Sequence, residues 1–458
     1  MGGQTTYDLD SASSWKVALA CSWNMFWTSI VQRSGGVVFY AILKTYCTTR
    51  EQATWATTLF FSVACFLGPL VGFLTMFLET RTISLVGTTI VGMSTVACVF
   101  ADDAATLTVL LGVLNGVGSG FVFTANDVTI CKNFQTYRAT GSGINYTGGV
   151  LAAFLYPSAI LYLIDYYGLR GALLISGGLC FNGLSGSLIY RTPQTSGTRS
   201  YSSRRKVVPI QQEPFKSLTD QNASATVAAI SHHMTLTKNF EGDDHNTKGR
   251  NGQDGATKTV LLTHFNFLYN PVFYLIVISG IAATYVQVIY VILVDFCTDE
   301  KGFDKRRGTW LLSISAITDA GARLLSGILS DRRVLDRKMM AMLNFSSIGS
   351  VLFILPRITS YNATALLCAI FGWSNGSVVI LLGPLMADYL GTKTLGISLG
   401  ICRCAMGIAF FGVPALSRHF KDVAGSYTGL IDVVGGSATV VGILWIAEIV
   451  RSKMQPAV

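Results

Sequence analysis

The chain has 458 residues, of which 50% are hydrophobic and only 13% are charged, with a mean hydropathy of +0.48 and a net charge of +9. It is too apolar for a soluble globular protein and too long for a single membrane anchor, so the composition predicts an all-α polytopic protein in the lipid bilayer. The basic excess lies in loops and in the central segment, as in positively charged cytoplasmic loops, so we expect no nucleic-acid partner.

Twelve apolar stretches of roughly membrane-spanning length divide six and six around a polar segment. The first six run over 15–43, 53–77, 82–101, 105–130, 140–164 and 169–190. The second six run over 265–295, 308–330, 338–356, 363–388, 394–416 and 427–449. We therefore predict two six-helix bundles, at 1–190 and 263–458, joined by a flexible cytoplasmic linker at 191–262, which has few large apolar residues.

An even number of spans puts both chain termini on one side of the membrane, together with the basic linker and the basic loop 330–338. We expect this side to be the cytoplasm, although the basic loop after the seventh span runs against the rule. The polar first fourteen residues lack the features of a cleaved signal, so the first span should be its own anchor. We expect a multi-pass protein of the plasma membrane with both termini in the cytoplasm.

Asp319 and Arg323 lie near the middle of the eighth span. Ionisable side chains at this depth are costly and normally face a partner or a cavity, and a spacing of four residues places these two on one helix face. They are candidates for binding a solute or a proton, and the alternative is an ion pair that only locks the bundle. An internal repeat at an offset of 255 residues, which aligns Thr54-Trp55 with Thr309-Trp310, pairs the two charges with Ala64 and Gly68, so an asymmetric site between the halves is expected.

Other motifs indicate no chemistry. Gly116, Gly118 and Gly120 follow no strand and favour close helix packing over a nucleotide loop. The ten cysteines are spaced like core residues, neither as a metal site nor as a disulfide framework, and no catalytic cluster is present in the sequence. We therefore expect no enzyme, no cofactor and no metal site.

Four stretches carry a family resemblance. They are YGLRGALLI at 167–175, the D-x-x-x-R and S-G of 319–327 with Asp331-Arg332, Gln32-Arg33-Ser34 with VVF at 37–39, and 133–148 from Asn133-Phe134 through Arg138 to Gly148. With these motifs the chain resembles the monocarboxylate transporter family (solute carrier family 16) of the major facilitator superfamily. The resemblance implies the two-bundle fold and a small organic anion, with or without protons, as substrate. It also brings in a single-span ancillary membrane protein, which some relatives need, as a candidate partner.

The resemblance assigns roles residue by residue. It implies that Asp319 and Arg323 handle proton and carboxylate, that Arg33 takes the place of a substrate-sensing lysine, and that Arg138 lies near the inner mouth. The loop after the second span departs from the family pattern, since it keeps only Arg81.

The arginine at position 33 has a consequence for coupling. A desolvated lysine can release its proton, whereas arginine stays protonated. If transport is proton-coupled, Asp319 should therefore carry the proton. Arg33 can still bind a carboxylate through its forked guanidinium, or it snorkels to the interface. Arg403, in the eleventh span, either pairs with an acid on a facing helix or adds positive potential to the cavity.

Three hypotheses follow. The first is proton-coupled monocarboxylate symport by alternating access. The second is pH-independent facilitated transport of a larger or zwitterionic solute such as an aromatic amino acid. The third is a non-transporting membrane receptor or scaffold, which the altered loop after the second span favours.

Overall fold

The computed structural model describes residues 9–46, 50–190, 266–332, 334–423 and 425–454. The residues before 190 and after 266 pack into one compact unit. The linker predicted at 191–262 lies outside the described residues, so this linker and the predicted domain boundaries stay a prediction.

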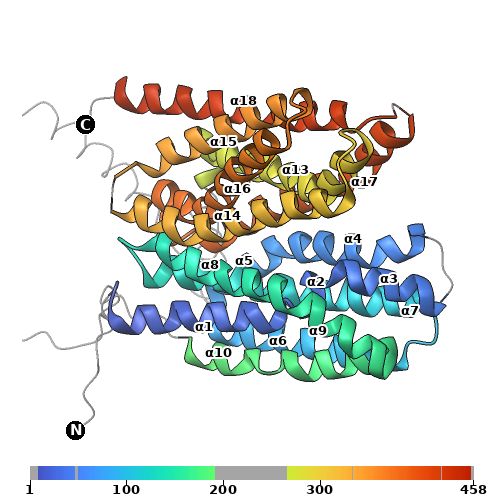
Figure 1. The fold of residues 1–458 in the computed structure, drawn as a ribbon. Helices are drawn as coiled ribbons and strands as arrows, with labels where there is room; N and C mark the ends of the chain where they lie inside the picture. Colours follow the sequence, from blue (N-terminus) through green and yellow to red (C-terminus); the bar gives the residue numbers. More distant parts are fainter. Residues whose placement is uncertain (1–8, 47–49, 191–265, 333, 424, 455–458) are drawn as a thin grey trace, which may run out of the picture. The chain divides into compact units, whose positions relative to one another are not determined.

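The first half of the unit holds the helices that follow one another from α1 to α10 (Figure 1, blue to green). They are α1 (Ala12–Thr28), α2 (Ile30–Arg33), α3 (Gly35–Tyr46), α4 (Arg50–Phe66), α5 (Gly68–Phe77), α6 (Thr80–Ala97), the 3-10 turn η1 (Cys98–Phe100), α7 (Ala104–Thr108), the π-helical segment η2 (Val109–Leu114), α8 (Asn115–Asn133), α9 (Arg138–Cys180) and α10 (Gly183–Ile189).

The second half runs from yellow to red in Figure 1. It contains the 3-10 turn η3 (Asn266–Tyr269), α13 (Pro271–Asp299), α14 (Lys305–Asp331), α15 (Arg337–Ile354), the 3-10 turn η4 (Leu355–Arg357), α16 (Tyr361–Leu390), α17 (Leu395–Arg418), the π-helical segment η5 (His419–Val423) and α18 (Thr428–Met454).

Ten stretches of the described chain are long and apolar enough to cross a membrane. One of them, Arg138–Ile189, covers two expected spans, because the helix breaks at Gly168, whose φ of 68° is a left-handed conformation that glycine adopts without strain. The first expected span is missing from the ten because it is divided at Ser29 and Ser34 into α1, α2 and α3. The twelve spans predicted from hydropathy are therefore present.

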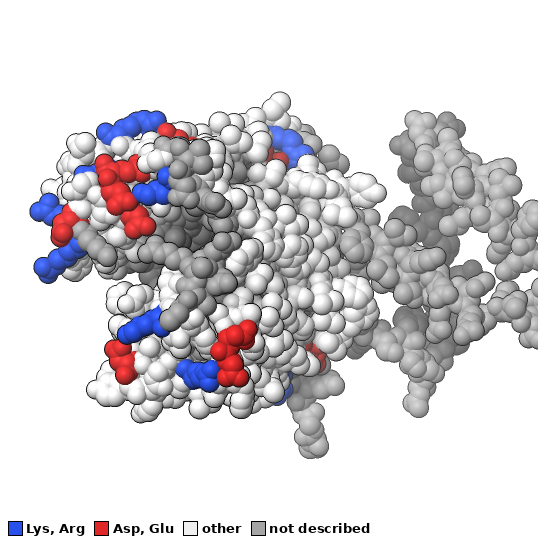
Figure 2. Space-filling view, turned by 90° about the vertical axis from the view of Figure 1, so that its right-hand side faces the viewer, with Lys and Arg blue, Asp and Glu red and all other residues white. Residues whose placement is uncertain are grey.

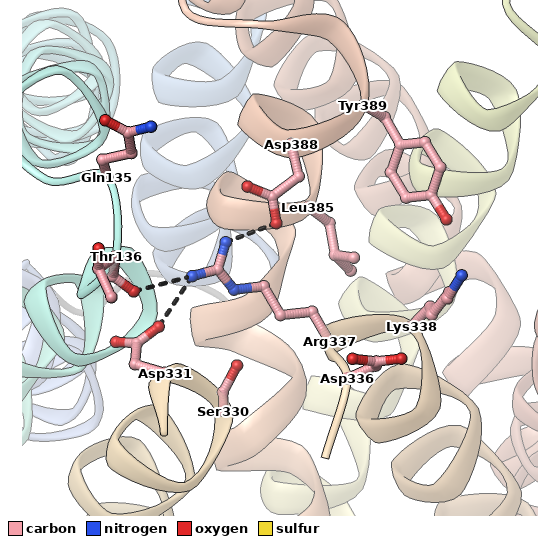
Figure 3. A pocket seen from close by; sticks show the side chains of 10 residues that line it. All are labelled: Gln135, Thr136, Ser330, Asp331, Asp336, Arg337, Lys338, Leu385, Asp388 and Tyr389. Atoms are coloured by element: carbon pink, nitrogen blue, oxygen red, sulfur yellow. Dashed lines mark hydrogen bonds and ion pairs between the residues drawn. The ribbon is translucent and has the colours of Figure 1, made fainter. Parts of the chain in front are cut away.

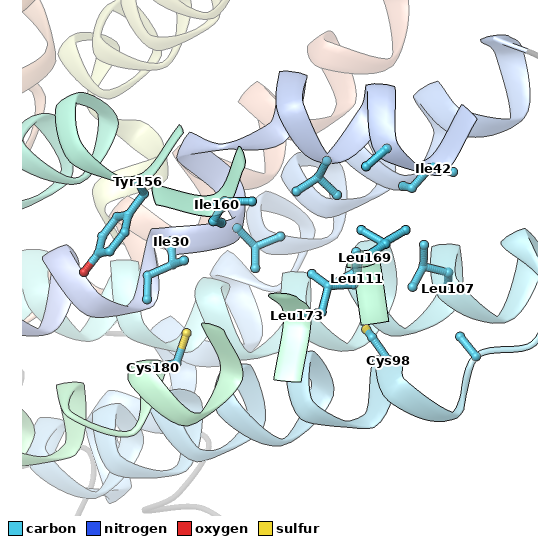
Figure 4. Close-up of a cluster of buried hydrophobic side chains, with 14 of the residues drawn as sticks. Ile30, Ile42, Cys98, Leu107, Leu111, Tyr156, Ile160, Leu169, Leu173 and Cys180 are labelled. Atoms are coloured by element: carbon cyan, nitrogen blue, oxygen red, sulfur yellow. The ribbon is translucent and has the colours of Figure 1, made fainter. Parts of the chain in front are cut away.

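Apolar side chains pack within each half and also cover its outside. One cluster, drawn in Figure 4, fills the space between the broken first span, α6, α7 and the α9 segments, with Ile30, Leu107, Ile160 and Leu173 all buried. In Figure 2 most of the visible surface is uncharged, and Lys, Arg, Asp and Glu are confined to patches. This distribution suits helices whose outer faces contact lipid.

The two halves touch through two matching pairs of helices. Gly68 and Gly72 of α5 lie directly against Gly400 and Gly396 of α17, where an added Cβ would collide with backbone. In the same way, Gly143 of α9 lies against the backbone of Arg323, and Gly327 of α14 lies against that of Ala139. Gly396 and Gly400 each follow Ala139 and Gly143 by 257 residues, close to the repeat offset found in the sequence. The sequence repeat is thus also a repeat of the contacts between the halves.

The glycines of α8 pack as the sequence indicates. A Cβ on Gly116 or Gly120 would meet the backbone of α4, at Phe60 and Ala64, and one on Gly118 would meet α6. These residues therefore allow close approach of three helices.

Candidate substrate-binding cavity

A cavity of about 690 Å³ lies between the two halves. The first half contributes residues of α1, α2, α3, α4, η2, α8 and α9, and the second half contributes residues of α13, α14, α16 and α17. Most of the lining is apolar or aromatic, and the charged members are Arg33, Asp127, Arg323 and Arg403. A cavity with an apolar wall and a few fixed charges suits a small solute with one charged group.

Asp319 and Arg323 form the ion pair that their spacing on α14 favours. Nε and Nη2 of Arg323 lie 2.9 and 2.8 Å from Oδ2 of Asp319, and both residues are buried. The other carboxylate oxygen, Oδ1, accepts a hydrogen bond of 3.0 Å from Asn375, which in turn accepts one of 3.2 Å from Gln287. Arg323 lines the cavity and Asp319 does not, so Asp319 fixes the guanidinium from behind.

Arg33 ends the short helix α2, between the breaks at Ser29 and Ser34. It lines the cavity, and its Nε is buried with no hydrogen-bond partner among the described residues. The neighbouring Gln32 also lines the cavity, and its Oε1 is likewise buried with no hydrogen-bond partner among the described residues. The Arg33 side chain is half-buried and its Nε has no partner, so this guanidinium is ready to receive an anion.

Arg403 has a partner that the sequence analysis missed. Its Nη2 contacts Oδ2 of Asp127 on α8, which makes an ion pair between the two halves. The hydroxyl of Tyr146 on α9 donates to both oxygens of Asp127 at 3.1 Å, and its ring lies 6.0 Å from the guanidinium of Arg323. The sequence analysis passed over Asp127 because it lies three residues before the end of the fourth predicted span, whereas Asp319 lies near the middle of the eighth.

Arg138 lies away from this cavity, at the end of the unit where α1 begins and α18 ends, which we call the termini end (Figure 1). Its Nη1 lies 2.9 Å from Oδ1 of Asp388, so it joins α9 to α16. Gly148, which ends the fourth of the resembling stretches, lies directly against the backbone of Ser22 in α1.

A second pocket, of about 600 Å³, opens at the termini end (Figure 3). Arg337 crosses it, with Nη2 2.8 Å from Asp331 and Nη1 2.5 Å from Asp388. Asp331 also accepts hydrogen bonds from the backbone N–H groups of Ala139 at 3.2 Å and Thr140 at 2.7 Å. The last residue of α14 therefore caps the first turn of α9, across the boundary between the halves. In the corresponding loop after α5, Glu79 and Arg81 are exposed.

A family model for the Major Facilitator Superfamily matches residues 19–414. The chain belongs to the major facilitator superfamily. Human monocarboxylate transporter 12 is 22% identical over 437 residues, covering 95% of this chain and 80% of the relative. Rat monocarboxylate transporter 13 is 22% identical and covers 93% of this chain and 86% of the relative, and mouse monocarboxylate transporter 14 is 22% identical and covers 98% and 91%. The predicted resemblance to monocarboxylate transporters is thereby confirmed.

The fold agrees with a solved structure. FucP, a transporter of the superfamily crystallised in the outward conformation, superposes with a TM-score of 0.58 over 94% of this chain and 97% of its own, at 13% identity. The predicted fold of two six-helix bundles is confirmed, and the protein is a multi-pass membrane transporter of the superfamily type.

Proposed function

We propose that the protein transports a small organic anion of the monocarboxylate class by alternating access. The observation that carries the proposal is Arg33, a half-buried cation that lines the central cavity without a carboxylate partner among the described residues. Its forked donors match a carboxylate, and the surrounding apolar and aromatic lining accommodates the organic remainder. The names of the similar relatives support the same substrate class.

In this proposal the halves rock about the cavity and expose it to each side in turn. The contacts at the termini end, where Asp331 caps α9 and Arg337 bridges two acids, would close that side. We propose that the termini end faces the cytoplasm and that the plasma membrane holds the protein. The contacts would then have to separate for release into the cell.

Proton symport is the first candidate for energy coupling, since carboxylates on both halves belong to the cavity network. Facilitated transport without protons, of a larger or zwitterionic solute such as an aromatic amino acid, is the second. The observation in its favour is that Asp319 is held by Arg323 and Asn375 and does not belong to the cavity lining.

The test is uptake of labelled lactate, pyruvate and aromatic amino acids into proteoliposomes at outside pH 6 and pH 8. We expect monocarboxylate uptake that rises at pH 6 and falls at least tenfold in Arg33→Lys, because an ammonium replaces the two-pronged contact. Arg357→Lys is the matched control, since Arg357 forms an exposed pair with Asp432. Uptake that is equal at both pH values supports the second candidate, and no uptake of any solute would favour the receptor hypothesis.

Asp319→Asn separates two roles in the same assay. If Asp319 carries the transported proton, the variant loses the response to pH. If it only holds Arg323 in place, uptake falls at both pH values and the ratio between them is kept, because the amide still accepts one hydrogen bond.

A further inference from the structure

Among the described residues that line the central cavity, Asp127 is the only acidic one. Its side chain is 10% exposed, it lies on α8 of the first half, and its partner Arg403 lies on α17 of the second half. Asp319, the acid that the sequence singles out, is absent from the lining. The Asp319 side chain is equally buried, at 11% exposed, so what distinguishes Asp127 is its place in the cavity lining.

The cavity lining carries more positive than negative charge. Three guanidinium groups, of Arg33, Arg323 and Arg403, face one lining carboxylate, and Asp319 neutralises Arg323 from behind. With Asp127 ionised, Arg403 is neutralised and Arg33 is the cation left for a solute. With Asp127 protonated, Arg403, whose side chain is 17% exposed, would also be left without a counter-ion, which is unfavourable unless another anion arrives. Protonation of Asp127 and binding of an anion should therefore favour one another.

We propose that Asp127 is the proton site of this transporter and that the neutralised Asp127 releases Arg403 to bind the carboxylate of the solute, a proposal that rests on the proposed function. A proton from cavity water adds to a carboxylate oxygen of Asp127, and its ionic contact with Arg403 breaks. An N–H of Arg403 then donates to the carboxylate of the solute. On the far side the solute leaves, Asp127 loses the proton to water, and the ion pair re-forms. One proton and one monoanion cross together, with no net movement of charge.

Among the charged and titratable groups around Asp127, Arg403 is the cation in direct contact with its carboxylate. The titratable and charged groups that face Asp127 or its ion pair are Tyr146 of α9, Arg403 of α17, Arg323 of α14, Cys21 of α1, Cys65 of α4, Cys131 of α8 itself and Tyr190, which follows α10. Helix α5 and the segment η2 have no ionisable residue, and α6 has only Arg81, in its first turn. Near the termini end, α16 carries Asp388, which is paired with Arg138 and Arg337.

The decisive experiment is infrared difference spectroscopy of the full-length protein in liposomes, between pH 8 and pH 5. We expect a band of a protonated carboxyl group that is lost in Asp127→Asn and kept in Asp319→Asn. Asp102→Asn is the control for exposed acids, because the Asp102 side chain is 93% exposed. A band that is kept in Asp127→Asn, a band that is lost in Asp319→Asn instead, or no such band in the wild type overturns the proposal.

Asp127→Asn alone leaves Arg403 as a half-buried cation without a counter-ion and can impair folding, so Asp127→Asn/Arg403→Gln, which removes both charges, is measured beside it. The same variants enter the uptake assay with a solute that the wild type transports. We expect the ratio of uptake at pH 6 to that at pH 8 to fall to about 1 in both, and an unchanged ratio in either overturns the proposal. If no solute is transported, the proposed function fails, while the infrared result still decides whether Asp127 takes up the proton.

Discussion

Replacement of Asp331 tests whether the termini end is closed by a cap that one half provides to the other. The Asp331 side chain is 1% exposed, and it accepts from Thr140 N–H at 2.7 Å, from Ala139 N–H at 3.2 Å and from Arg337 at 2.8 Å. Asp331→Ala removes all three interactions. Asp331→Asn removes the charge but keeps an oxygen that can still cap α9.

The expected magnitude follows from the hydrogen bonds that each substitution removes. A cap is worth about 0.5–2 kcal/mol, and hydrogen bonds to a charged group about 1.5–3 kcal/mol. Because the groups share one carboxylate, we expect about 2–3 kcal/mol in total for Asp331→Ala. At about 1.4 kcal/mol per factor of ten, the closed arrangement should become about 30-fold to 150-fold less favoured relative to open ones. Asp331→Asn should cost about 1 kcal/mol, close to the worth of one neutral hydrogen bond.

Hydrogen–deuterium exchange of the amides in the first turn of α9 reports this cap directly, because Ala139 and Thr140 are protected by Asp331. We expect faster exchange there in Asp331→Ala, a smaller increase in Asp331→Asn, and none in the matched control Asp336→Asn. Asp336 belongs to the same loop, is exposed and makes no capping hydrogen bond with its side chain. Exchange at 139–140 that is unchanged in Asp331→Ala would refute the cap across the halves.

Two further predictions concern packing and a surface charge pair. Gly143→Ala would bring a methyl group into the carbonyl oxygen of Arg323, so we expect a cost of about 1–3 kcal/mol and a lower midpoint of thermal unfolding, whereas Gly178→Ala, also on α9, has open space and should be neutral. Outside the membrane, the 2.7 Å contact with Lys421 lowers the pKa of Asp299. The stabilisation of the fold by this ion pair is present above the pKa of an unfolded aspartate. It is lost as the pH falls through the lowered pKa of Asp299 in the folded protein. Lys421→Gln should therefore lower the unfolding midpoint slightly at pH 7 and not in strong acid.

The number of spans could be predicted from the sequence because it depends only on local apolarity and length. Pairing of Asp319 with Arg323 was predictable for the same reason, since a spacing of four residues on one helix fixes their neighbourhood. The breaks at Ser29 and Ser34 were not predicted. They divide an apolar run into three helices without a proline to mark the place.

Contacts between the halves were beyond the sequence analysis. Asp127 and Arg403 are 276 residues apart, and no local pattern reports that α8 and α17 meet. Which of Asp319 and Arg323 lines the cavity was equally hidden, because both lie on one face of α14 and only the packing of other helices decides it. The repeat could have helped, since Arg403 follows Tyr146 by the same 257 residues that relate the glycine contacts.

That correspondence bears on how an asymmetric site arises from two similar halves. Tyr146 and Arg403 take equivalent places on α9 and α17, and each reaches the side of the cavity formed by the other half: Tyr146 reaches Arg323, and Arg403 reaches Asp127. The two positions also meet each other, through a 3.4 Å contact between the Arg403 guanidinium and the Tyr146 hydroxyl. A change in charge at Asp127 therefore acts on Arg403 by direct contact and on Arg323 through the Tyr146 ring. Both solute-facing arginines of the second half would respond to one protonation event in the first.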